Sequence, residues 1–295
     1  MVVLLQILDG KNLSKKIKNK LIQTVNNLNR KPKLVIISIG NDFASKVYVK
    51  NKIKACEEVG IDITVISKEI DITREQLIQI IDMLNQDPQI DGIIVQEPLP
   101  KHLEGVSEQI SIDKDVDGFT SGNLGKLILN DNTAYIPCTP KGIVQLLNTT
   151  DIPIEGKNVV IIGRSKIVGK PLAILLTNMN ATVTLCHSKT TNLKQICQTC
   201  DILITAVGKP NFITRDYIGN NTRIVIDVGI NRTQNGKVVG DVNYEEVCQI
   251  FKNRINTNYI TPVPRGVGPM TVTNLISNTI ISYIKRNSDT NIIGG

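Results

Sequence analysis

The sequence is poor in the residues that stack on nucleic-acid bases. Its 295 residues include no tryptophan and 3% aromatic side chains, whereas proteins that bind single strands combine aromatic platforms with a basic groove. The net charge is +7, but the lysines are scattered along the chain. We therefore interpret the charge as a solvated surface that helps to attract anionic substrates, and we predict no nucleic-acid partner.

The chain also lacks a membrane segment, a secretion signal and paired cysteine motifs. No apolar run has the length of a membrane span, and residues 2–8 are too short and lack the preceding basic region of a signal peptide. Six dispersed cysteines without such a signal are typical of a reducing compartment. Cys197 and Cys200 have C-x-x-C spacing without a second pair or a nearby histidine, which favours packing over zinc. We predict a cytoplasmic protein with no membrane association and no metal.

Residues 158–169 have the pattern of a buried strand followed by a phosphate-binding loop. The strand ends at Ile162, and Gly163 and Gly169 enclose a loop that opens a helix. Backbone N–H groups and the positive end of that helix favour an anionic phosphate. The glycine spacing is not G-x-G-x-x-G, so the pattern alone is weak. An ordinary strand–helix–strand crossover is the alternative.

The next strand, expected at residues 181–186, is not followed by an acid. NAD-selective folds place Asp or Glu there to bind the ribose hydroxyls, whereas this chain has His187-Ser188-Lys189-Thr190. Arg164, Ser165 and Ser188 suit an additional 2′-phosphate, which a carboxylate would repel. We therefore predict NADP in preference to NAD.

Strands alternate with amphipathic helices before this loop, which predicts an α/β protein with a mostly parallel sheet. The chain is long enough for two domains. We expect an N-terminal α/β domain at residues 1–145 plus 272–295 and a Rossmann-type NADP-binding domain at 146–271. The last helix is expected to return to the first domain, and the tail from Ser288 has a loose, end-of-chain composition.

One predicted helix carries a lysine on its apolar stripe. In the helix at residues 44–59, Lys52 lies one turn from Tyr48. A lysine in a partly apolar pocket gives up its proton more readily and can take part in proton transfer. The alternative, equally compatible with the helix, is a lysine whose stem packs while its charge reaches solvent. Tyr-x-x-x-Lys also occurs in short-chain dehydrogenases, but there the pair follows the glycine loop, and here it precedes Gly163.

Two further polar residues, one at a strand end and one in a loop, are candidates for binding a ligand. Gln96 lies at the carboxyl end of a strand, where open α/β sheets bind ligands, although it could instead satisfy the turn before Pro98. Residues 113–118 begin like a calcium loop, but its twelfth position holds Leu124 instead of glutamate. We predict no calcium and interpret Asp117, next to a glycine, as a candidate for hydrogen-bonding a polar heterocycle.

Together these motifs closely resemble the bifunctional methylenetetrahydrofolate dehydrogenase/methenyltetrahydrofolate cyclohydrolase family. The matches span nearly the whole chain in order, and several motifs in register are highly specific. They are YVKNK (48–52), VQEPLP (95–100), KDVDG (114–118), PCTPKG (137–142), GRS (163–165), VGKP (168–171), PVP (262–264) and GVGPMT (266–271).

The resemblance implies a homodimer whose two domains flank a folate cleft. It implies oxidation of 5,10-methylenetetrahydrofolate by NADP to the methenyl cation and hydrolysis of that cation to 10-formyltetrahydrofolate. Lys52 would be the acid/base residue of the hydrolysis, supported by Tyr48 and Gln96, while Asp117 would hold the pterin ring and Pro264 would also contact substrate. The implied cofactor-binding residues are Gly163, Arg164, Ser165, Gly169, Ser188, Ile230 and Thr271.

Three positions depart from the family pattern, which usually has Leu at Glu97, Gly at Arg265 and Pro at Ile112. Glu97 and Arg265 fall in loops expected to line the folate cleft, where they could pair with each other. Alternatively, Arg265 narrows the site and weakens one activity. The competing functions are a dehydrogenase without cyclohydrolase activity, against which the retained acid/base residues argue, and a non-catalytic NADP-binding sensor.

Overall fold

The computed structural model describes residues 5–40, 42–233 and 236–287, so the expected tail from Ser288 lies outside the described residues. The chain forms two compact units. We call residues 1–14 and 139–271 the large-sheet unit, and residues 15–138 and 272–295 the small-sheet unit.

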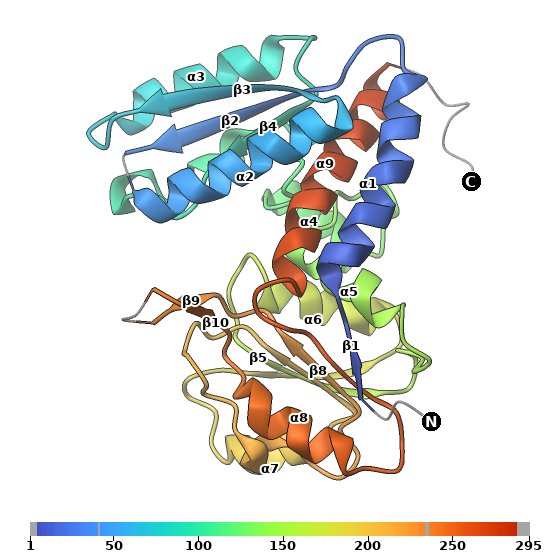
Figure 1. The fold of residues 1–295 in the computed structure, drawn as a ribbon. Coiled ribbons are helices and arrows are strands. Elements are labelled where there is room, and N and C mark those ends of the chain that lie inside the picture. Colours follow the sequence, from blue (N-terminus) through green and yellow to red (C-terminus); the bar gives the residue numbers. More distant parts are fainter. Residues whose placement is uncertain (1–4, 41, 234–235, 288–295) are drawn as a thin grey trace. The chain divides into compact units, whose positions relative to one another are not determined.

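The small-sheet unit is built on three parallel strands in the order β3-β2-β4. The strands are β2 (Lys33–Ile39), β3 (Asp62–Lys68) and β4 (Gly92–Val95). Because parallel neighbours need a crossover, helix α2 (Phe43–Val59) joins β2 to β3, and α3 (Arg74–Gln86) joins β3 to β4 (Figure 1). The central strand β2 is buried from Leu34 onward, which explains its continuous β-branched run.

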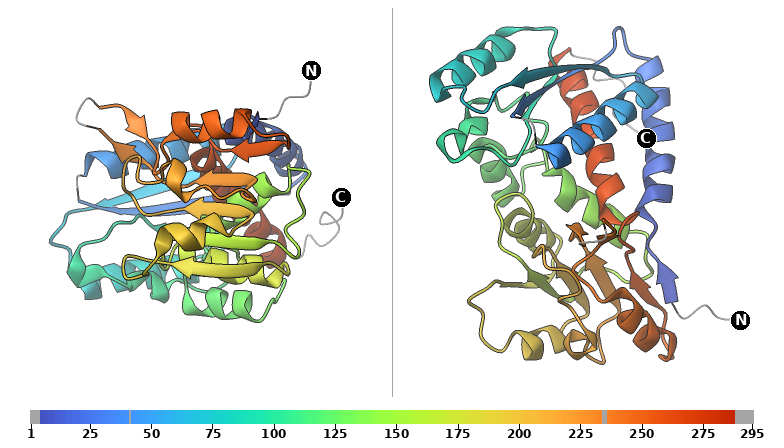
Figure 2. Two further views of the ribbon diagram at one scale, coloured as in Figure 1. Left: turned by 90° about the horizontal axis from the view of Figure 1, so that it is seen from below. Right: turned by 60° about the vertical axis from the view of Figure 1, so that its left-hand side comes forward.

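The last helix, α9 (Val267–Arg286), closes the core of this unit from Val272 on. Its Leu275, Ile280 and Tyr283 lie in one buried cluster with Leu34 and Ile36 of β2. Helix α1 (Gly10–Asn26) contributes to the same cluster and runs beside α9 (Figure 2). The expected return of the last helix is thus confirmed. Two 3-10 turns (Lys101–Leu103 and Val106–Gln109) and α4 (Ser121–Ile128) complete the unit.

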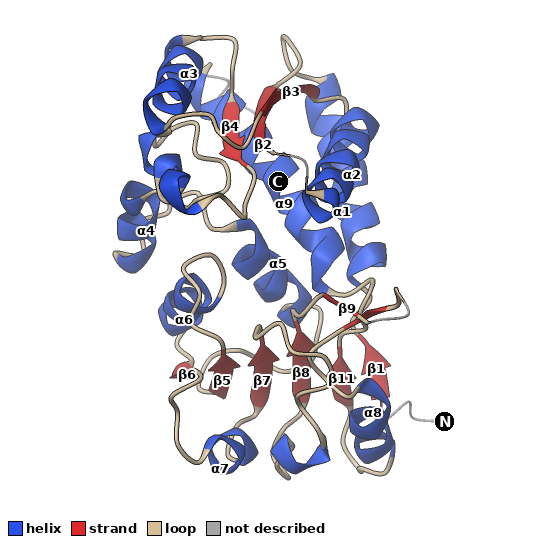
Figure 3. Ribbon diagram, turned by 90° about the vertical axis from the view of Figure 1, so that its left-hand side faces the viewer, coloured by secondary structure: helices blue, strands red, loops and turns tan. Residues whose placement is uncertain are grey.

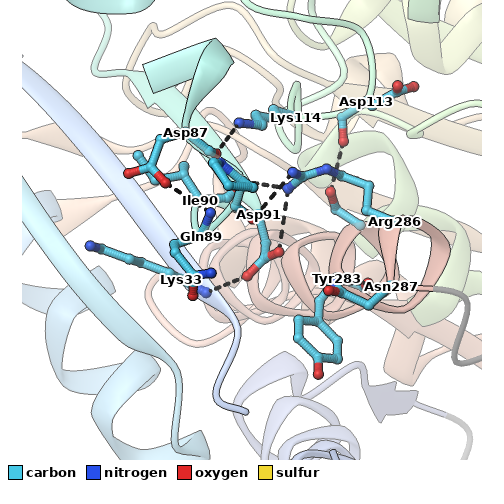
Figure 4. A network of polar contacts seen from close by, with 12 residues as sticks. Lys33, Asp87, Gln89, Ile90, Asp91, Asp113, Lys114, Tyr283, Arg286 and Asn287 are labelled. Carbon is cyan, nitrogen blue, oxygen red and sulfur yellow. Dashed lines mark hydrogen bonds and ion pairs between the residues drawn. The ribbon is translucent and has the colours of Figure 1, made fainter. Parts of the chain in front are cut away.

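A buried carboxylate in the turn before β4 forms hydrogen bonds with the end of α9 (Figure 4). Asp91 is fully buried and accepts two hydrogen bonds from Arg30, at 2.6 and 2.9 Å. It also accepts one from Arg286 of α9 at 3.3 Å and one from the N–H of Lys33 at 2.8 Å. Nearby, Lys114 Nζ donates to three carbonyl oxygens at the end of α3, at 2.6 to 2.9 Å. These contacts fix the position of the start of β4 and thereby help to position Gln96, which follows the end of this strand.

The large-sheet unit contains six strands in the order β1-β11-β8-β7-β5-β6, all paired in parallel (Figure 3). The strands are β1 (Leu5–Ile7), β5 (Asn158–Ile162), β6 (Thr182–Cys186), β7 (Ile202–Thr205), β8 (Ile224–Asp227) and β11 (Asn258–Ile260). The helices are α5 (Cys138–Leu147), α6 (Gly169–Asn178), α7 (Leu193–Gln198) and α8 (Tyr244–Lys252), with a 3-10 turn at Arg215–Tyr217. A small antiparallel hairpin is formed by β9 (Asn231–Arg232) and β10 (Val238–Val239).

The chain passes between the units at residues 14/15, 138/139 and 271/272. We expected the N-terminal residues in the first domain, but β1 pairs with β11, so residues 5–14 belong to the large-sheet unit. The middle crossing lies at the start of α5, earlier than the expected boundary at residue 145. Within the described ranges, no helix combines the length and apolar character needed to cross a bilayer.

Candidate active site

Lys52 and Gln96 meet at the carboxyl end of the small sheet. Lys52 Nζ, from α2, donates a hydrogen bond of 3.0 Å to Gln96 Oε1. Gln96 follows β4, and its backbone N–H donates to Ile37 O of β2 at 2.8 Å. Its Nε2 donates to Glu97 O at 2.7 Å, so the amide oxygen faces the lysine. Lys52 is therefore held by a neutral acceptor and does not simply extend into solvent.

Asp117 lies at the same end of this sheet. The segment before it runs parallel to β4 through the bridge Ile93–Asp115. Asp117 therefore comes after this bridge just as Gln96 comes after β4, towards the carboxyl end of the sheet. Its side chain is partly accessible, yet surrounding protein atoms desolvate the carboxyl group and raise its pKa, against the opposing effect of the Lys52 charge. Tyr48, which is 41% exposed, precedes Lys52 by one turn of α2. The structure thus places all four predicted residues in one unit.

A second carboxylate organises the loop that carries Asp117. Asp115 is buried and has five donors, which satisfy both of its oxygens. The donors are the N–H groups of Gly118 (3.0 Å), Phe119 (3.2 Å) and Thr120 (2.9 Å), the Thr120 hydroxyl (2.7 Å) and Asn123 Nδ2 (2.9 Å).

Sequence reasoning missed two residues that support Asp117. Asn278 Nδ2, on α9, donates to Val116 O at 2.9 Å and to Ile136 O at 3.1 Å, which fixes the residue before Asp117. The Cys138 thiol donates to Val116 O at 3.5 Å, and its proximity acts to lower the pKa of Asp117. Asn278 is one of several polar residues that α9 buries, among them Asn274, Thr279 and Ser282, so the sequence pattern did not single it out.

The glycine loop of the large-sheet unit is closely packed. A Cβ on Gly169 would lie 1.8 Å from Gly163 O, and a Cβ on Gly163, whose φ is +123°, would lie 2.3 Å from Ala206 O. Only glycine fits either position, so the loop folds back against the first turn of α6. Ser165 Oγ accepts the N–H groups of Val168 (3.2 Å) and Gly169 (3.4 Å). Its hydroxyl proton can therefore be donated to an anion.

The residues expected to bind a 2′-phosphate lie beside this loop. Gly163 N donates to Cys186 O at 2.9 Å, which joins the loop to the end of the strand before Ser188. Arg164 and Ser188 are exposed, and the turn at residues 187–190 contains no acidic side chain. The glycine cradle, the Ser165 hydroxyl and the absence of a carboxylate in this turn fit a phosphorylated dinucleotide.

Three other predicted residues also belong to the large-sheet unit. Ile230 is 47% exposed, and Thr271 Oγ1 lies 2.9 Å from Thr139 Oγ1. Pro264 follows a cis peptide bond in the loop between β11 and α9. The expected substrate residues are therefore divided between the units, with Pro264 in one and the Lys52 group in the other.

The two unusual loop residues have partners other than each other. Arg265 forms an ion pair with Asp9, and its carbonyl accepts the N–H of Lys11 at 3.0 Å. Glu97 accepts the N–H of Leu99 at 3.1 Å. Each residue therefore has a partner inside its own unit, and the pairing of Glu97 with Arg265 stays a prediction.

The cysteines of the C-x-x-C motif are packed in the core of the large-sheet unit. Burial raises the pKa of Cys197 to about 12 and that of Cys200 to about 11, which makes both thiols poor nucleophiles and ligands. Over the described part of the chain, no cluster of three or more His, Cys, Asp or Glu side chains is suited to holding a metal ion.

A lysine-centred polar cluster at the end of one parallel sheet and a glycine phosphate loop in another unit are features of dinucleotide-dependent enzymes. Residues 8–117 match the sequence model of the tetrahydrofolate dehydrogenase/cyclohydrolase catalytic domain, and residues 137–287 match that of its NAD(P)-binding domain. The chain belongs to the tetrahydrofolate dehydrogenase/cyclohydrolase family.

Relatives support this assignment over almost the full length. The chain is 48% identical to the bifunctional protein FolD of Bacillus cytotoxicus over 281 residues, covering 94% of this chain and 96% of the relative. It resembles the crystal structure of the bifunctional FolD enzyme of Campylobacter jejuni with a TM-score of 0.90 and 44% identity, covering 96% and 99% of the two chains. A Trypanosoma brucei enzyme solved with NADP and an inhibitor has a TM-score of 0.86 and 32% identity, with coverage of 96% and 98%.

Proposed function

We propose that this protein is a bifunctional one-carbon folate enzyme. It oxidises 5,10-methylenetetrahydrofolate to 5,10-methenyltetrahydrofolate with NADP and then hydrolyses the product to 10-formyltetrahydrofolate. The observation that carries the proposal is the 3.0 Å hydrogen bond between Lys52 and Gln96 beside Asp117, in a chain that also retains the glycine phosphate loop. The family match and the bifunctional relatives support both activities.

The small-sheet cluster performs the hydrolysis. As water adds to the electrophilic methenyl carbon, Lys52 acts as the base that takes the proton the water loses. The same proton can then pass to the folate nitrogen as the carbon–nitrogen bond of the five-membered ring opens. The adduct's hydroxyl oxygen becomes the formyl oxygen and its proton is released to water, which leaves the formyl group on the other nitrogen. Gln96 holds Nζ in place throughout, with Tyr48 beside it. Asp117, whose pKa is raised by burial, can donate or accept hydrogen bonds at the polar edge of the pterin ring.

The large-sheet unit holds the cofactor, which when bound supplies the hydride acceptor for the oxidation. Gly163, Gly169 and Ser165 provide a close-fitting backbone surface and a hydroxyl donor for a phosphate. Arg164 and Ser188 would bind the 2′-phosphate. The exposed side chain of Ile230 offers an apolar surface, and Thr271 a hydroxyl, to the remainder of the dinucleotide.

We also propose that the protein is a homodimer of the cytoplasm. The six buried thiols suit a reducing compartment, and the family resemblance implies the dimer. Light scattering on the purified protein would detect twice the 32.5 kDa chain mass; a monomer at working concentration would refute the assembly.

Replacing Lys52 by methionine tests the function. Absorbance of NADPH and of the methenyl intermediate is followed after 5,10-methylenetetrahydrofolate and NADP are added. We expect the wild type to form NADPH without lasting methenyl accumulation. Lys52→Met should hydrolyse supplied methenyltetrahydrofolate at least about 100-fold more slowly. Lys54→Met, an exposed lysine on the same helix, is the matched control and should behave like the wild type.

The outcomes separate the competing functions. A folded wild type that binds NADP but forms no NADPH would support a non-catalytic sensor. Formation of NADPH with stable methenyl accumulation would indicate a dehydrogenase alone. Equal hydrolysis by the wild type and Lys52→Met would remove Lys52 from the mechanism.

A further inference from the structure

Two buried aspartates lie at the carboxyl ends of β7 and β8 in the large-sheet unit. Asp227 is the last residue of β8, and Asp241 follows the β9–β10 hairpin. They are 3% and 0% exposed. A buried carboxylate is costly unless its oxygens are hydrogen-bonded, so their donors show what the two groups hold in place.

Asp241 joins the segments that leave two neighbouring strands. Its carboxylate accepts hydrogen bonds from three successive N–H groups after β7 and from a side chain that follows β8. The donors are Val207 N (2.7 Å), Gly208 N (3.2 Å), Lys209 N (2.8 Å), Asn231 Nδ2 (2.9 Å) and, at the end of β7 itself, Thr205 Oγ1 (3.4 Å). One carboxylate therefore sets the spacing between residues 207–209 and the residue after Ile230.

Asp227 holds Asp241 in position from the other side. It accepts the N–H groups of Gly229 (3.0 Å), Asp241 (2.9 Å) and Val242 (2.9 Å). Two glycines allow these close approaches, because a Cβ on Gly229 would lie 2.2 Å from Asp241 Oδ1 and one on Gly240 would lie 1.8 Å from Asp227 Oδ2. The backbone on both sides of Ile230 is thus fixed by the aspartate pair.

These segments border the phosphate loop. Strands β5, β7 and β8 are adjacent, and Ala206 N donates to Ile162 O, immediately before Gly163, at 2.8 Å. Gly163 packs so closely against Ala206 O that it admits no side chain. Residues 206–209 therefore lie between the phosphate loop and the segment of Ile230, at the sheet edge where parallel α/β folds bind ligands.

We propose that Asp241 is a positioning residue of the dinucleotide site, which fixes the segments after β7 and β8 without itself contacting the cofactor. The inference rests on the proposed NADP-dependent function. A carboxylate is required because all five of its partners are donors. An asparagine would turn an NH2 group towards N–H groups and force the segments apart.

Asp241→Asn tests this inference by direct NADPH binding, measured from the fluorescence of the bound nicotinamide. We expect the dissociation constant for NADPH and the KM for NADP to rise by about tenfold or more, since small displacements of a binding surface are costly. Hydrolysis of supplied methenyltetrahydrofolate should stay within about twofold of the wild type. Asp216→Asn is the control, because Asp216 is an exposed aspartate of the same unit, paired with Lys194, and its replacement should leave both quantities unchanged.

Asn231→Ala gives a second, milder test if Asp241→Asn does not fold. It removes one side-chain donor to Asp241 and should raise the NADPH dissociation constant in the same direction. A lowered melting temperature with unchanged NADPH affinity, in each of these variants that folds, would show that Asp241 has a purely structural role. That result would overturn the inference but leave the proposed function intact. A wild type that does not bind NADPH would overturn the inference together with the proposed function.

Discussion

Replacing Arg265 by alanine and by glycine separates its backbone strain from its ion pair. Arg265 has φ of +91°, a region in which a Cβ is disfavoured by about 1–2 kcal/mol. Its guanidinium pairs with Asp9, and the two side chains are 57% and 20% exposed, so the pair contributes only about 0.2–1 kcal/mol. The strain and the ion pair are therefore of similar size and opposite sign.

Alanine removes the ion pair and keeps the strain, whereas glycine removes both. The glycine variant also has a free energy of unfolding lower by about 0.5–1 kcal/mol than alanine would give, because glycine allows the unfolded chain more conformational freedom. We expect Arg265→Ala to destabilise the protein by up to about 1 kcal/mol. Arg265→Gly should be about 0.5–1 kcal/mol more stable than Arg265→Ala and close to the wild type.

Urea denaturation followed by circular dichroism measures these differences, provided that the slopes of the transitions agree among the variants. Repeating it in 1 M salt adds a control, because a Debye length of about 3 Å screens the exposed ion pair but not the backbone strain. The loss in Arg265→Ala should shrink in salt, while the gap between alanine and glycine should persist. A glycine variant less stable than the alanine variant, or a gap that salt abolishes, would refute the reasoning.

Two further replacements concern the partly accessible carboxyl group of Asp117 and the buried one of Asp91. Asp117→Asn should abolish folate binding yet raise the free energy of unfolding at pH 8 by about 1 kcal/mol. Desolvation raises the pKa of Asp117 in the folded protein, so the ionised carboxylate destabilises the wild type above that pKa. Calorimetry should therefore show that the stability difference between variant and wild type becomes smaller as the pH falls through the pKa of Asp117. Asp91→Asn should lower the free energy of unfolding by about 2–4 kcal/mol because it leaves Arg30 and Arg286 without their buried partner. Asp216→Asn breaks an exposed ion pair and should lower the free energy of unfolding by less than about 1 kcal/mol. Equal effects of the two replacements in urea denaturation would contradict this ranking.

The sequence was informative wherever a local pattern determines the structure. Continuous β-branched runs predicted the buried strands β2 and β5, since strands covered on both faces need apolar residues at every position. The spacing of Tyr48 and Lys52 placed both on one helix, and the position of Gln96 at a strand end predicted that it lies at the ligand-binding edge of a sheet. The hydrogen bond between Lys52 and Gln96 became visible only in the structure.

Pairings between distant segments were not predictable in the same way. The three-residue strand β1 has no pattern that distinguishes the large sheet from the small one, and its partner β11 lies at the other end of the chain. The role of Asp241 was missed because most of its partners are backbone N–H groups, which every residue except proline has. Gly229 and Gly240 carried an indirect signal, since each leaves room for a carboxylate of the other segment.

In both candidate sites a buried carboxylate fixes the backbone of a loop. Asp115 in the small-sheet unit and Asp241 in the large-sheet unit each accept three successive backbone N–H groups, a threonine hydroxyl and an asparagine amide. Successive N–H groups converge on an anion only when the backbone turns sharply, so each carboxylate selects one conformation of the loop that follows a strand end. The residues that we propose to face ligands, Asp117 in one loop and Ile230 beside the other, do not have to stabilise these loop conformations themselves. They can therefore keep side chains that cost stability, a desolvated carboxyl group and an exposed isoleucine, because buried carboxylates hold the backbone around them.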